Sequence, residues 1–115
     1  MPKIAPRLEI TEHPLYQETM AAQHLAYQLM KGVPADHKAD ATRLHVACVH
    51  ATTYAQYALD PDVADKPGSY EGLRSALAKA RRQLSPLMAV ADANEAEALL
   101  AKLAEIEKTA LAAQG

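Results

Sequence analysis

Four cationic side chains gather in the segment LRSALAKARRQLSPL, although the chain as a whole has a formal net charge of −2. Arg74 and Arg81 are seven residues apart, so on a helix they point in nearly the same direction. Lys79 and Arg82 are three residues apart and share an adjoining face. A basic side of this kind can neutralise phosphates, and an arginine can bind one phosphate through two N–H groups. The same side can equally be a solvated helix face.

The second interpretation pairs these cations with carboxylates near the end of the chain. A run of charges on a helix is usually a solvated surface, and exposed ion pairs contribute little to stability. Charge alone therefore favours a solvated face that contacts the acidic residues of the last predicted helix. These residues are Glu95, Glu97, Glu105 and Glu107.

Residues that could bind a metal or perform catalysis do not form the usual patterns. A di-iron bundle needs paired Glu-x-x-His motifs, and neither these nor His-x-x-x-His occurs. Cys48 follows His45 by three residues, but a mid-helix cysteine on an apolar stripe is more often an inert packing residue. We therefore expect no metal, no cofactor, no catalytic residue and no enzyme activity. The histidines are expected to be caps, partly buried groups or solvated side chains: His13, His24, His37, His45 and His50.

Length and composition indicate one helical domain without disulfides. A chain of 115 residues supports one core, and a single cysteine excludes an internal disulfide and fits a reducing compartment. With five tyrosines and no phenylalanine or tryptophan, small aliphatic residues must fill the core, which suits close helix–helix contacts. No apolar run approaches the roughly 20 residues of a membrane helix, and no signal-peptide pattern opens the chain. We expect a soluble, cytoplasmic protein.

Proline and glycine divide the chain into an extended N-terminal arm, residues 1–12, and four helices within residues 13–115. The first helix is predicted to begin near Pro14 and to end at KGVP, where Gly32 can adopt a left-handed cap. The second is predicted to begin after Asp36 and to run to about Leu59.

The third and fourth helices are predicted from caps and leucine stripes. Ser69 is the expected N-cap of the third helix, and Pro86 should kink it or end it early. Asn94 is the expected N-cap of the fourth helix, and Glu97 closes a capping box with it. The two stripes are Leu73, Leu77, Ala80, Leu84 and Leu87, and then Leu99, Leu103, Ile106 and Ala110.

Four amphipathic helices with mostly short connections indicate an all-α, antiparallel up-down-up-down four-helix bundle. The first two helices carry a wider apolar surface than one seam requires, which favours assembly into a homo-oligomer. The alternative places these side chains at the edge of an ordinary core. The residues expected at the oligomer interface are Tyr16, Met20, Tyr27, Val46, Val49 and Tyr57.

Three stretches resemble a known family of four-helix bundles. They are KGVPADHK after Tyr27, then ATRLHVACVHA, and then YEGLRSALAKARRQL with its leucine-arginine pattern. Together they resemble the family of ribosomal-RNA intervening-sequence proteins and, more closely, the accessory variability determinant proteins of diversity-generating retroelements. The resemblance spans about Leu15 to Leu111.

The resemblance implies a pentameric barrel of four-helix subunits that accompanies a reverse transcriptase and binds RNA or DNA through a basic surface. This comparison makes four residues candidates for contact with nucleic acid or the polymerase: Arg74, Lys79, Arg81 and Arg82. Lys38 and Arg43 are weaker candidates. Family members that bind RNA are strongly basic, whereas this chain is acidic overall.

Two function classes therefore remain. The first is a non-enzymatic accessory protein that binds a reverse transcriptase and nucleic acid. The second is a structural or protein-interaction bundle that binds no nucleic acid. A small enzyme would need a pocket that unites His45, Cys48 and a carboxylate from another helix.

Overall fold

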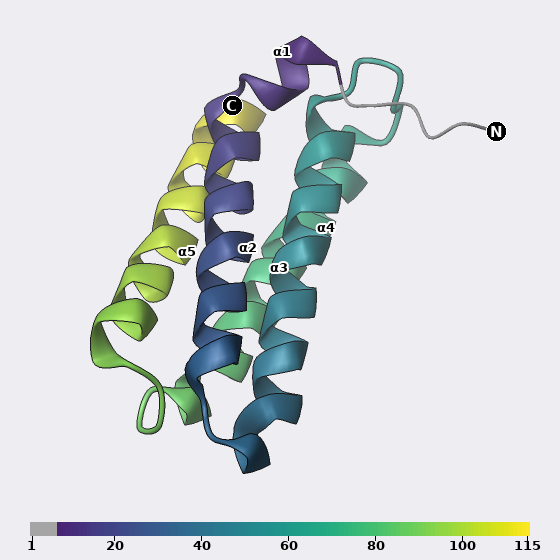
Figure 1. The fold of residues 1–115 in the computed structure, drawn as a ribbon. Coiled ribbons are helices and arrows are strands. Elements are labelled where there is room, and N and C mark those ends of the chain that lie inside the picture. The colour runs from purple at the N-terminus through teal and green to yellow at the C-terminus, as the bar shows by residue number, and fades with distance from the viewer. Residues whose placement is uncertain (1–6) are drawn as a thin grey trace, which may run out of the picture.

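The structure is a computed structural model, and residues 7–115 are described here. These residues form helices and no strands, which confirms the all-α class for this part of the chain. In Figure 1 four long helices lie side by side, and a short helix lies across one end, beside the C-terminus. The helices are α1 (Leu8–Thr11), α2 (Pro14–Gly32), α3 (Lys38–Leu59), α4 (Lys66–Leu84) and α5 (Ala93–Gln114), with the short 3-10 helices η1 (Ala35–His37) and η2 (Ser85–Leu87).

The ends of the long helices follow the proline and glycine positions closely. The predicted start at Pro14 and the predicted end at Leu59 are confirmed. The effect expected of Pro86 is also confirmed, because α4 ends at Leu84 and a 3-10 turn containing the proline follows.

The extended arm predicted for residues 1–12 is wrong for the part that the structure describes. Leu8–Thr11 is helical, and Ile10 is only 3% exposed. Arg7, which precedes this turn, forms an ion pair with Asp62 in the loop between α3 and α4. Burial of one apolar side chain therefore fixes this segment against the bundle. Residues 1–6 lie outside the described part of the chain.

Three predicted helix caps are wrong. Gly32 does not adopt a left-handed cap, since Gly115 is the only one of the described residues with a positive φ. α4 begins before Ser69, because the Asp65 side chain accepts a hydrogen bond from the Gly68 N–H at 2.9 Å. Asp92 rather than Asn94 caps α5, accepting from the Glu95 N–H at 3.0 Å. In both helices an aspartate earlier in the sequence accepts the hydrogen bond from a free backbone N–H group of the first turn.

The core lies between the four long helices and consists of leucine and alanine. Both predicted stripes are buried, from Leu73 to Leu87 and from Leu99 to Ala110. α3 contributes mainly small side chains, most of them three or four residues apart, which allows close contact with α4. These residues are Ala41, Ala47, Ala51, Ala55 and Ala58. None of the helices in residues 7–115 has the length and apolar character needed to cross a membrane.

Candidate functional site

The four cations of α4 divide into two pairs that face different neighbours. Arg74 donates a hydrogen bond to Gln114 at 2.7 Å, and Arg81 forms an ion pair with Glu107. Both partners belong to α5, so this pair follows the prediction of a solvated face beside the last helix. The Arg81 and Glu107 side chains are 35% and 41% exposed, and solvent therefore limits this contact to about 1 kcal/mol or less.

Lys79 and Arg82 lie on the other side of α4, in a groove that α4 forms with α3. No carboxylate in residues 7–115 lies within ion-pair distance of either side chain, and both residues are exposed. Arg43 of α3 lines the same groove, and its one ion-pair partner among residues 7–115 is Asp40 on its own helix, at 2.8 Å. Three cations from two helices therefore meet along one groove.

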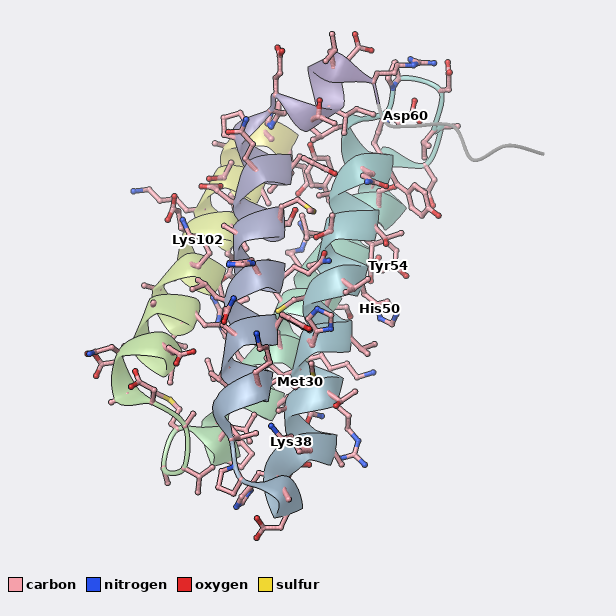
Figure 2. All side chains as sticks on the ribbon, viewed as in Figure 1. Met30, Lys38, His50, Tyr54, Asp60 and Lys102 are labelled. Atoms are coloured by element: carbon pink, nitrogen blue, oxygen red, sulfur yellow. The ribbon has the colours of Figure 1, made fainter. Side chains whose placement is uncertain are left out.

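The groove consists of two adjoining hollows of about 510 and 180 Å³ that share His50 and Lys79. Each helix contributes one side chain every three or four residues, the spacing of a single helix face. The α3 stripe contains Arg43, Val46, His50 and Tyr54, and the α4 stripe contains Gly68, Gly72, Ser75, Lys79 and Arg82. Figure 2 shows His50 and Tyr54 projecting from α3 on the side of the molecule away from α5.

The charge along the groove is uneven. Glu71 is the one carboxylate among its lining residues, and it precedes Lys79 by eight positions on α4. At about 1.5 Å per residue, the two side chains are separated by roughly 12 Å along the helix axis. Around Lys79 and Arg82 the groove therefore carries an excess of positive charge, although Asp40 balances Arg43 and the whole chain is negative.

Tyr54 lies at the other end of the groove, against Gly72. A Cβ atom added to Gly72 would lie 2.4 Å from the Tyr54 Cε1 atom, closer than any side chain allows. A glycine inside a helix costs about 1 kcal/mol relative to alanine, and here its bare backbone admits the ring. Tyr54 remains 37% exposed, and its ring centroid is 6.3 Å from that of Tyr57 in an edge-to-face arrangement.

Lys38 does not line this groove, and its predicted contact with nucleic acid stays a prediction. Its Nζ donates to the carbonyl oxygens of Met30 and Lys31 at 2.7 and 2.9 Å. Figure 2 shows Met30 and Lys38 together at the junction of α2 and α3. Lys38 therefore caps the C-terminus of α2, where a cation is favoured.

The residues predicted to form an oligomer interface lie on α2 and α3, and they differ in exposure. Met20, Tyr27, Val46 and Tyr57 are between 40% and 46% exposed. Tyr16 and Val49 are partly buried. Met20 and Tyr27 line a further hollow of about 330 Å³ with Gln23, His24 and His45.

The side chains of Cys48 and His45 pack against their neighbours. Cys48 is fully buried, and burial raises the pKa of its thiol to about 12. His45 packs against Tyr27, with ring centroids 5.7 Å apart. Among residues 7–115, no three histidine, cysteine, aspartate or glutamate side chains are close enough together to hold a metal ion.

A pair of carboxyl groups lies between α2 and α5. Glu18 accepts a hydrogen bond from Thr109 at 3.0 Å, while its other carboxyl oxygen is buried without a hydrogen-bond partner among residues 7–115. Burial and the neighbouring Glu105 raise the pKa of Glu18. Lys102, which donates to Glu105 at 3.0 Å, lowers the pKa of Glu105, with a smaller contribution from the neighbouring Glu18.

Sequence reasoning did not assign His50, Tyr54 or Gly72 to a binding surface. A signal was present, because His50 and Tyr54 continue the spacing of Arg43 and Val46 along one face of α3. Comparisons with protein-family models, curated proteins and solved structures gave no match for this chain. The family resemblance of the sequence therefore stays a prediction.

Proposed function

We propose that this chain is a non-enzymatic binding protein whose groove between α3 and α4 holds the phosphates of a nucleic acid. The observation that carries the proposal is the meeting of Arg43, Lys79 and Arg82 along one groove, with no carboxylate partner for Lys79 or Arg82 in residues 7–115. Unpaired cations remain available to replace the counterions of a phosphate backbone. The family resemblance adds the role of an accessory protein to a reverse transcriptase.

The test compares two double variants that remove the same charge from the same helix. The groove variant, Lys79→Ala with Arg82→Ala, removes two cations from the groove. The control variant, Arg74→Ala with Arg81→Ala, removes the two cations that contact α5. With a labelled RNA oligonucleotide of about 15 nucleotides, we expect the groove variant to bind about tenfold more weakly. The slope of the logarithm of affinity against the logarithm of salt concentration should also become shallower by about 1.4, because two phosphate contacts are lost.

The control variant should bind RNA as the unaltered protein does, once its helicity has been verified by circular dichroism. An equal loss of affinity in both variants would show that only overall charge matters, and that the groove is not the site. Negligible RNA binding by the unaltered protein would favour the alternative, a structural or protein-interaction bundle without nucleic-acid binding.

We further propose that the fold is an antiparallel up-down-up-down four-helix bundle. Two contacts between α4 and α5 support this arrangement: Arg74 with Gln114, and Arg81 with Glu107. Residue numbers rise along α4 while they fall along α5, as in antiparallel helices. Between α2 and α3, the contacts of Tyr27 with His45 and of Gln23 with Thr52 run in opposite directions in the same way (Figure 1).

We also propose a homo-oligomer that forms through the apolar surface of α2 and α3. Its support is the exposure of Met20, Tyr27 and Val46, which a monomer would leave in water. A pentamer is favoured only by the family resemblance. Tyr27→Glu should lower the mass measured by light scattering without loss of helicity, because a charge is costly to desolvate in a subunit seam. A monomer mass for the unaltered protein at micromolar concentrations would refute this assembly.

A further inference from the structure

Tyr54 gives the groove a feature that phosphate binding alone does not require. We propose that the groove binds an unpaired nucleic-acid strand and that Tyr54 stacks on one of its bases. This inference rests on the proposed nucleic-acid function, and it names the form of nucleic acid and the residue that selects it. The cations of the groove hold phosphates of any strand, whereas an aromatic ring can stack only on a base that is free of its own helix.

The position of Tyr54 supports this role. The groove runs between α3 and α4, with Arg43 and Arg82 near one end and Tyr54 at the other. His50 and Lys79 lie between these ends, so the cations and the ring line the same groove. Gly72, against which the ring packs, precedes Lys79 by seven residues, which is about 10 Å along the helix axis. A strand that lies in the groove can therefore meet the cations with its phosphates and the ring with a base.

The ring is held in place, which lowers the entropy that stacking would otherwise cost. Gly72 packs against one face of it, since a Cβ atom there would overlap the Cδ1, Cε1 and Cζ atoms of Tyr54 from above the ring plane. Tyr57 lies edge-to-face with the same ring, at a centroid distance of 6.3 Å. With 37% of Tyr54 exposed, part of the residue stays accessible to a ligand.

The groove does not fit a double helix equally well. An A-form or B-form duplex keeps its bases stacked inside, so the tyrosine would contact only sugars and phosphates. An acidic protein segment could satisfy the cations without any contact to the ring. The combination of unpaired cations with a fixed aromatic side chain therefore favours a single strand.

The experiment uses three probes of about 15 nucleotides: a single RNA strand, its duplex, and an abasic strand with the same number of phosphates. We expect the unaltered protein to bind the single strand about tenfold more tightly than the abasic strand, and more tightly than the duplex. Tyr54→Leu should reduce the ratio of base-bearing to abasic affinity to about one, while the salt dependence stays unchanged. Tyr54→Phe should keep the ratio.

Gly72→Ala is a second, independent variant, because it moves the ring while leaving every cation and Tyr54 itself in the sequence. We expect it to lose the preference for bases and to retain binding of the abasic strand. Equal affinity of the unaltered protein for base-bearing and abasic strands would overturn the inference but leave the proposed function standing. So would tighter binding of the duplex, or an unchanged ratio in Tyr54→Leu.

Failure of the proposed function looks different. If the unaltered protein binds none of the three probes, or if polyglutamate competes with RNA at equal charge concentration, the groove is not a nucleic-acid site and the inference falls with it. Each outcome thus separates the role of the ring from the role of the cations.

Discussion

The carboxyl pair between α2 and α5 predicts a pH-dependent stability, and one substitution should remove the contribution of Glu18. Glu18→Gln keeps an oxygen that can accept the 3.0 Å hydrogen bond from Thr109. The new amide N–H₂ takes the place of the buried oxygen that has no partner, and it can donate to Glu105. The variant therefore resembles the protonated form of Glu18 at every pH.

The direction in which stability changes with pH follows from the two pKa shifts. Burial and the nearby Glu105 raise the pKa of Glu18 in the folded state, so this group contributes stability at low pH that is lost as the pH rises through its folded pKa. Glu105 acts in the opposite direction, because Lys102 lowers its pKa, and its contribution is lost as the pH falls through that value. Glu18→Gln removes only the first effect.

We expect the variant to be more stable than the unaltered protein at neutral pH by about 1 kcal/mol. An unsatisfied buried polar group costs roughly 1–3 kcal/mol, and we take the low end because Glu18 is only partly buried. For a chain of this size, about 1 kcal/mol corresponds to a rise of roughly 4 °C in Tm. At a pH low enough to protonate Glu18, the two proteins should have equal stability.

The assay is urea denaturation followed by circular dichroism across a pH series from about 4 to 8. Glu97→Gln is the matched control, since Glu97 is exposed and has no ion-pair partner in residues 7–115. It should show no pH-dependent difference. If Glu18→Gln were instead destabilising at neutral pH, the Glu18 carboxylate would be stabilising the fold, and the assignment of its raised pKa to burial would be wrong.

Two further predictions concern residues with structural roles. Cys48 should not react with a thiol reagent at about pH 8 until the protein is unfolded, because burial raises its pKa to about 12; rapid reaction of the folded protein would contradict its burial. Lys38→Met should lower the free energy of unfolding in urea by about 1–2 kcal/mol, because it removes two hydrogen bonds at the end of α2, yet leave RNA affinity unchanged. A loss of affinity with unchanged stability would instead return Lys38 to the binding surface.

The sequence predicted the long helices well because their ends depend on local chemistry. Pro14 and Pro86 act through their own rings, so their effects are independent of tertiary structure. The caps were less predictable, because Asp65 and Ser69 are both good N-caps and lie four residues apart. Ser69 is instead only 6% exposed, and its hydroxyl group donates to the Asp65 carbonyl oxygen at 2.9 Å.

The site was predictable only in part. Helical spacing alone separates Arg74 and Arg81 from Lys79 and Arg82, and the structure confirms that separation. Which pair faces α5 depends on how the helices pack, and periodicity carries no information on this. Lys38 illustrates the same limit, because the carbonyl groups that it caps belong to another helix.

The two proposed surfaces meet on α3, and their overlap predicts coupling between them. Val46 lines the groove together with Arg43 and Lys79, whereas Tyr27 lines a hollow on the α2 side. A subunit interface that contains Tyr27 but not Val46 would leave the groove open. An interface that includes Val46 would cover the smaller of the two hollows of the groove. In the second case RNA and assembly compete, and linkage requires each to weaken the other equally. Light scattering with and without saturating RNA distinguishes the cases: a lower protein mass with RNA places Val46 in the seam, and an unchanged oligomer excludes it.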